Sequence, residues 1–157
     1  MNVKFMNPFL DAATEVLQAE CQIEANRGNL ILQKTSMTTD EITVMISMIG
    51  HVRGVVLYGL SIATALKLVS RVMGQEFEQF DNLAQSGIAE LGNVISGRAT
   101  VKLSQAGYST DISPPTLILG KGIEISTLDF ARIVVPLTFE ENGIEVHLAL
   151  REASGLN

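Results

Sequence analysis

Apolar residues recur along the chain at two spacings, and the spacings come in blocks rather than alternating one by one. After Asn7-Pro8, a pair that suits the first turn of a helix, apolar residues follow at helical intervals as far as Cys21. Residues 42–49 are β-branched and nearly alternating, which predicts a strand, and after a break at Gly50 residues 52–60 are predicted to continue as a second strand, joined to the first as a hairpin through Gly50-His51. A shorter strand is predicted over 28–34.

The middle of the chain predicts two helices. Ser61 suits an N-cap and Gly74 suits a helix end. The apolar side of this first helix is formed by Ile62, Ala65, Leu66, Val69, Val72 and Met73. After a polar loop, the longest helical pattern runs over about 82–106, and Pro114-Pro115 excludes helix beyond it.

The last part of the chain returns to strand patterns, at 116–119, 130–139 and 144–150. Glu141-Asn142-Gly143 predicts a hairpin between the last two, because Asn-Gly favours a tight turn. Pro136 lacks an N–H and predicts a sheet edge or a bulge. The order of elements predicts one α+β domain over 1–157, with a largely antiparallel sheet flanked by helices.

The long helix has two contrasting sides. One side is apolar and consists of Ala84, Ile88, Leu91, Ile95 and Ala99, while small polar residues and glycine make up the other: Ser86, Glu90, Asn93, Gly97, Thr100 and Ser104. Glu90 and Asn93 stand three residues apart, so their side chains are neighbours. An ordinary solvated helix face would carry more Lys and Glu, so the low charge of this stripe indicates a surface that contacts another molecule.

Three glycines lie inside the same helix, at 87, 92 and 97. Each costs about 1 kcal/mol relative to alanine in a helix interior. Gly97 lies on the polar stripe, which predicts the close approach of a partner protein there. Gly87 and Gly92 lie elsewhere on the helix and are predicted to serve packing within the fold.

The pattern Ser86-x-x-x-Glu90-x-x-Asn93, continued by residues 94–99 and followed by Pro114-Pro115, resembles the signature helix of the CheC/CheX/FliY phosphatases, and most closely that of CheX. The resemblance implies a CheC/CheX-like fold, a homodimer and the hydrolysis of the aspartyl phosphate of a CheY-like response regulator. Asn93 would orient the attacking water, and Glu90 would pair with a lysine of the regulator. Ser86, Gly97 and Thr100 would face this partner. The regulator would carry Mg²⁺, and this chain would need no cofactor or metal.

A weaker copy of the motif lies on the first helix, as Asp11-x-x-x-Glu15-x-x-Gln18. CheC-type proteins, which this chain resembles, are built from two related halves, and some carry two motifs. Here glutamine replaces asparagine, and no proline follows at the expected distance. We interpret this copy as degenerate.

Composition narrows the possible functions. Apolar residues make up 46% of the 157 and charged residues 18%, which is typical of a folded chain. The net charge is −6 and the basic residues are scattered, so a nucleic-acid surface is not expected. Cys21 is the single cysteine, and the sequence has no stretch typical of a signal peptide or membrane span, so we predict a cytoplasmic protein. His51 and His147 have no neighbours at metal-ligand spacing.

Two other classes of function stay open. A CheX-like module could bind a receiver domain or a flagellar-switch component without hydrolysing anything, and exposure of Glu90 and Asn93 on one side would discriminate against it. A small-molecule enzyme would need a deep pocket with perturbed titratable groups. The sequence offers no cluster from which to build one.

Overall fold

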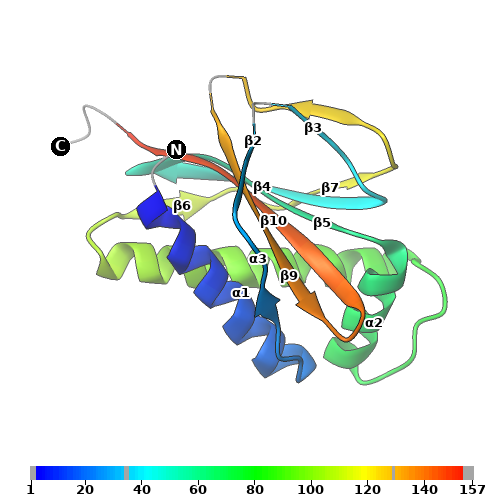
Figure 1. Cartoon of the computed structure of the whole chain (residues 1–157). Coiled ribbons are helices and arrows are strands. Elements are labelled where there is room, and N and C mark those ends of the chain that lie inside the picture. The colour runs from blue at the N-terminus through cyan, green and yellow to red at the C-terminus, as the bar shows by residue number, and fades with distance from the viewer. Residues whose placement is uncertain (1–2, 34–35, 129, 154–157) are drawn as a thin grey trace.

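The computed structural model describes residues 3–33, 36–128 and 130–153 (Figure 1). Within them a short 3-10 helix, Val3–Phe5, precedes three α-helices: α1 Met6–Cys21, α2 Ile62–Met73 and α3 Asn82–Gln105. The strands are β1 Asn26–Arg27, β2 Ile31–Gln33, β3 Ser36–Thr38, β4 Ile42–Gly50, β5 Val52–Leu60, β6 Thr110–Ile112, β7 Thr116–Leu119, β8 Glu124–Ser126, β9 Arg132–Phe139 and β10 Asn142–Glu152. No helix in these ranges is long and apolar enough to cross a membrane.

The main sheet is antiparallel and has the order β1-β9-β10-β5-β4-β6, with β2 also beside β9 and β7 also beside β4. A separate two-stranded ribbon joins β3 to β8. Figure 1 shows the three helices together on one side of the main sheet and this ribbon on the other side. The predicted α+β class and antiparallel sheet are confirmed.

One hydrophobic core fills the space between the sheet and the helices. Alternate residues of the central strands point into it, among them Val44 and Ile46 of β4 and Val56 of β5. They meet the buried side of α3, which includes Ile88 and Ile95. Apolar residues repeat about every two positions in the strands and every 3.6 in the helix, as predicted, so the apolar side chains of both elements meet in one packed layer.

The two central helices begin and end as predicted. The Ser61 hydroxyl accepts a hydrogen bond from the Thr64 N–H at 3.1 Å, and Gly74 ends α2 in the left-handed region. Only part of the apolar side predicted for α2 is buried, because Ile62 is 39% exposed and both Val72 and Met73 are 37% exposed. Val72 and Met73 border a groove between the helices, described below.

The last hairpin turns two residues earlier than predicted. Glu140 and Glu141 form the turn, with positive φ values of 46° and 67°, while Asn142 and Gly143 already belong to β10. Neighbouring charges hold this uncommon backbone, because Lys67 and Arg71 both pair with the Glu140 carboxylate, at 2.6 and 2.8 Å. The prediction of an Asn-Gly turn was therefore wrong in register.

Pro136 lies at a bulge on one side of β9, as predicted, because residues 28–30 stand opposite only residues 135–136 between the pairs Arg27–Leu137 and Ile31–Val134. It stands opposite Glu145 in unbroken register with β10. On its other side β9 is covered by β1 at one end and by β2 at the other, so Pro136 falls where these short strands leave a gap. The Gly28 N–H donates to the Pro136 carbonyl at 2.7 Å in that gap. Sequence patterns predicted neither β1 nor the short strands β3, β6 and β8.

A buried arginine fastens the far side of the sheet. Arg132 is fully buried and donates to the Gln33 side chain and the Ser36 carbonyl, both at 2.6 Å. Its Nε also donates to Nδ1 of His147 at 3.2 Å. Burial lowers the pKa of this guanidinium, because removal from water disfavours its charged form. Arg132 thus ties β9 to the segment that carries β2 and β3.

Candidate functional site

Helix α3 lies directly on the sheet because Gly92 leaves no side chain between them. A Cβ at Gly92 would stand 2.9 Å from Val44 Cγ1 and 3.5 Å from Tyr58 Cδ2. Gly87 has a similar role toward α2, since its Cβ would meet Met73 Cε at 3.1 Å and Val69 Cγ1 at 3.3 Å. The prediction that Gly87 and Gly92 serve packing within the fold is confirmed.

A buried hydrogen bond fixes the rotation of α3 about its own axis. Tyr58 of β5 and Ser96 of α3 share it, with the two hydroxyl oxygens 2.8 Å apart. Burial raises the pKa of Tyr58 far above its ordinary value of 10.0, so the phenol stays protonated and can donate. With this side of α3 held against the sheet, its opposite side must face outward.

Glu90 and Asn93 lie on that outward side. Glu90 is exposed and Asn93 is half-buried. Neither side chain makes a hydrogen bond or an ion pair within the described part of the chain, and the same holds for the exposed Ser86 one turn before Glu90. A carboxylate and an amide therefore stand side by side, with their hydrogen-bonding atoms available to another molecule.

The other two predicted partner-facing residues differ in what they offer. A Cβ at Gly97 would meet no atom within 4 Å, so the helix backbone is open to approach there. The Thr100 hydroxyl donates to the Gly97 carbonyl at 2.6 Å, which already occupies its proton. For a partner, Thr100 therefore offers its methyl group and the oxygen lone pairs only.

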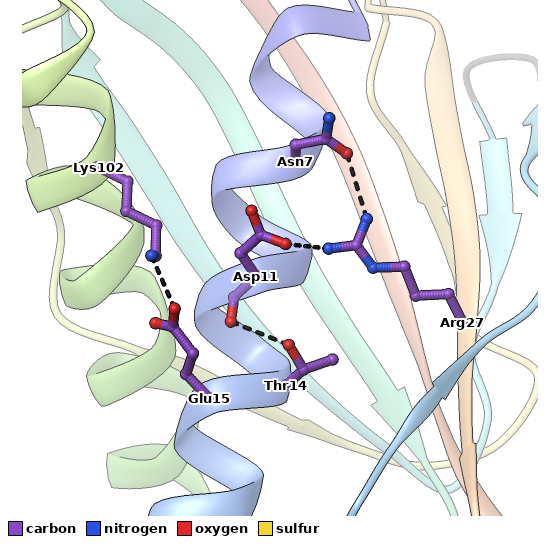
Figure 2. Close-up of polar contacts among 6 residues, drawn as sticks. All are labelled: Asn7, Asp11, Thr14, Glu15, Arg27 and Lys102. Atoms are coloured by element: carbon purple, nitrogen blue, oxygen red, sulfur yellow. Dashed lines mark hydrogen bonds and ion pairs between the residues drawn. The ribbon is translucent and has the colours of Figure 1, made fainter.

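The degenerate copy of the motif on α1 has its carboxylates paired inside the chain, as Figure 2 shows. Asp11 accepts a charge-assisted hydrogen bond from Arg27, which also donates to Asn7. Glu15 accepts from Lys102 of α3 at 2.9 Å. These contacts contrast with the unpaired Glu90 and support the interpretation that α1 carries no second site.

The described residues include no group of three or more His, Cys, Asp or Glu side chains that could hold a metal ion. Cys21 is buried, and this burial raises the pKa of its thiol to about 11. A thiol with that pKa is protonated at neutral pH, and the thiolate is the nucleophilic form.

Comparison with known proteins decides the family. The family described as chemotaxis phosphatase CheX matches residues 42–138, which include all of α3. The chain belongs to the CheX family. The CheY-P phosphatase CheX of Thermotoga maritima is 30% identical over 152 residues, covering 96% of this chain and 98% of that protein.

Solved structures agree with this assignment. A CheC-like superfamily protein from Shewanella sp. PV-4 has a TM-score of 0.86 at 26% identity, covering 96% of this chain and 99% of its own. CheX of Borrelia burgdorferi, solved as a complex with CheY, BeF₃ and Mg²⁺, has a TM-score of 0.82 at 29% identity, covering 96% of this chain and 100% of its own. The expected resemblance to CheC/CheX proteins is confirmed.

Sequence reasoning missed the groove beside Glu90. Its volume is about 420 Å³, and it opens where the last turns of α1 and α2 meet the first half of α3. The signal in the sequence was weak, because Val72 and Met73 fit the apolar side of a buried helix equally well. Glu20 of α1, which borders the same groove, carried no motif at all.

Proposed function

We propose that this chain accelerates hydrolysis of the aspartyl phosphate on a CheY-like response regulator. The observation that carries the proposal concerns Glu90 and Asn93, whose side chains have no hydrogen-bond or ion-pair partner among the described residues. They face outward on a helix whose other side is bonded to the sheet through Ser96 and Tyr58. Membership of the CheX family supports it, as does the CheY-P phosphatase from Thermotoga maritima. The Borrelia burgdorferi complex of CheX with CheY supports a partner of this kind.

The chemistry asks little of the phosphatase. Hydrolysis requires a water in line with the phosphorus, opposite the leaving aspartyl oxygen, and phosphoryl transfer depends mainly on positioning and charge neutralisation. The Asn93 amide can accept a hydrogen bond from this water and donate another to the phosphoryl group, without adding negative charge. In this proposal Asn93 orients the nucleophile.

Glu90 is proposed to position the regulator on this chain. An exposed carboxylate accepts charge-assisted hydrogen bonds from an ammonium group, so Glu90 is proposed to pair with a lysine of the regulator. That pair would fix the register in which Asn93 reaches the phosphate. Any Mg²⁺ is proposed to belong to the regulator, so the reaction would need no metal or cofactor on this chain.

The test follows loss of phosphate from a phosphorylated CheY-type receiver, with and without the protein. We expect Asn93→Ala to abolish acceleration, because removing an orienting group costs kcat, typically by a factor of about 10²–10³. Glu90→Ala should chiefly raise KM. Ser104→Ala, on the same exposed stripe, is the matched control.

Both variants must keep the far-ultraviolet circular dichroism and the unfolding midpoint of the wild type. Equal rates for wild type, Asn93→Ala and Glu90→Ala would refute the assignment. Binding of the phosphorylated receiver without faster phosphate loss would instead identify the non-catalytic module described above.

We also propose a cytoplasmic homodimer joined through sheet edges. Among the described strands β2 pairs with β9 alone, and its residues Ile31 and Leu32 are 49% and 68% exposed. An apolar edge strand favours pairing with another strand. Sedimentation of the wild type should give twice the monomer mass, and Leu32→Lys should give the monomer. A monomeric wild type would contradict this part of the proposal.

A further inference from the structure

The groove beside Glu90 has an apolar floor and two acidic rims. Val72 and Met73 come from α2, and Leu91 and Val94 from α3. Glu90 of α3 stands at one side. Glu20, on the last turn of α1, also borders the groove, as do Ser86 and Gly87. Its volume of about 420 Å³ falls in the range of roughly 300–1,000 Å³ that is common for ligand-binding hollows.

The groove is part of the surface that any partner of Glu90 must cover. Specific protein interfaces bury about 800 Å² on each partner, an area far larger than two side chains. Glu90 and Val94 are one helical turn apart, about 5.4 Å along the axis. A regulator that places a lysine on Glu90 therefore lies over the groove as well.

The negative charge of Glu20 and Glu90 at the rims of the groove favours a partner that carries a cation. Glu20 is exposed, and within the described residues its carboxylate makes no ion pair or hydrogen bond. The whole chain carries a net charge of −6. An apolar side chain with a cation beside it would bury apolar surface on the floor and find a counter-charge at the rim.

We propose that this groove receives an apolar side chain of the response regulator, with an adjacent basic residue of the regulator pairing with Glu20. The inference rests on the proposed function, and it assigns partner specificity to residues outside the Ser86–Asn93 motif. Val72 and Met73 then select the regulator, whereas Asn93 acts on its phosphate.

The test makes the groove polar without changing its shape. Val72→Thr combined with Met73→Gln keeps the side-chain sizes nearly constant and adds no charge that could pair with Glu90. We expect KM for the phosphorylated receiver to rise about tenfold, which corresponds to about 1.4 kcal/mol, while kcat stays within about twofold. Val3→Thr, at a residue that is 59% exposed and outside the groove, is the control and should change neither constant.

The acidic rim is tested by Glu20→Gln. We expect it to weaken receiver binding about threefold and to make the dissociation constant less dependent on salt concentration. Glu24→Gln removes the same charge from an exposed position on another hollow, so it controls for the net charge of the protein. Equal effects of the two substitutions would overturn the pairing with Glu20.

Failure of this inference can be told apart from failure of the proposed function. If the wild type accelerates phosphate loss and the Val72→Thr/Met73→Gln variant has an unchanged KM, the groove does not contact the regulator and the proposed function stands. If the wild type does not accelerate phosphate loss, the groove contact is tested by binding alone. The quantity measured is then the dissociation constant for the receiver carrying trifluoroberyllate. Weaker binding by the double variant supports the groove contact, and equal binding refutes it.

Discussion

Replacing Gly97 by alanine should make the protein more stable and less active. A Cβ at this position meets nothing within 4 Å, and φ lies outside the left-handed region. The substitution therefore gains the full difference in helix propensity between alanine and glycine, about 0.8–1 kcal/mol, with no steric cost. For a protein of this length, 1 kcal/mol corresponds to a rise in Tm of about 2–4 °C.

Gly92→Ala is the internal comparison, because it has the same propensity gain and the opposite surroundings. Its Cβ would stand 2.9 Å from Val44 Cγ1 on a strand beneath the helix. Overpacking of this kind costs about 1–3 kcal/mol, so the net result should be a loss of up to about 2 kcal/mol. Urea unfolding followed by far-ultraviolet circular dichroism measures both changes.

Activity gives the second half of the prediction. If the regulator brings its backbone close to Gly97, the added methyl group separates the surfaces and KM rises in the phosphatase assay even though the fold is more stable. A Gly97→Ala protein no more stable than the wild type would refute the open, helical surroundings of this residue. A variant that is more stable and fully active would refute the close approach of the regulator.

Three further changes probe the helix layer and its turn. Tyr58→Phe leaves the Ser96 hydroxyl buried without its partner and should cost about 1–3 kcal/mol in chemical unfolding; a loss below about 0.5 kcal/mol would mean that Ser96 bonds elsewhere. Glu15→Ala removes two largely exposed ion pairs, with Lys102 and Arg98, and should change the free energy of unfolding by less than about 1 kcal/mol while leaving phosphatase activity unchanged; a drop in activity would give the α1 copy a function. Lys67 donates to Glu140 and lowers the pKa of its carboxyl below 4.5, so the stabilisation is present above pH 4.5 and disappears as the pH falls through the lowered value. The Tm of Glu140→Gln should therefore lie below that of the wild type at neutral pH and converge with it in acid; a constant difference would refute the linkage.

The long elements could be predicted from the sequence because each has both a clear period and a physical end. Residues 52–60 form β5 over the predicted range, and the helix predicted over 82–106 is α3, Asn82–Gln105. The short strands β1, β3, β6 and β8 have two or three residues each, too few for a period to be visible. β1 and β6 are strands because they pair with longer neighbours, and β3 and β8 because they pair with each other; such pairing is a tertiary property.

The prediction of the last hairpin turn, which the structure places at Glu140 and Glu141, was wrong for a related reason. Local preference favours Asn-Gly, but the register of β9 with β10 and the cations of α2 place two glutamates in the left-handed region. The candidate site likewise has one part that local sequence predicts and one part that depends on tertiary packing. The outward direction of Glu90 follows from helical period alone, whereas the groove depends on how three helices converge, which no local pattern contains.

The fastening of α3 has a consequence for how recognition proceeds. A helix seated on Val44 through Gly92, and held in rotation by Tyr58, has little freedom to adjust when another protein arrives. Its amide hydrogens should be among the slowest in the molecule to exchange with solvent, which is unusual for a contact surface. Conformational adaptation during encounter must then fall to the incoming molecule, and binding should cost this chain little entropy.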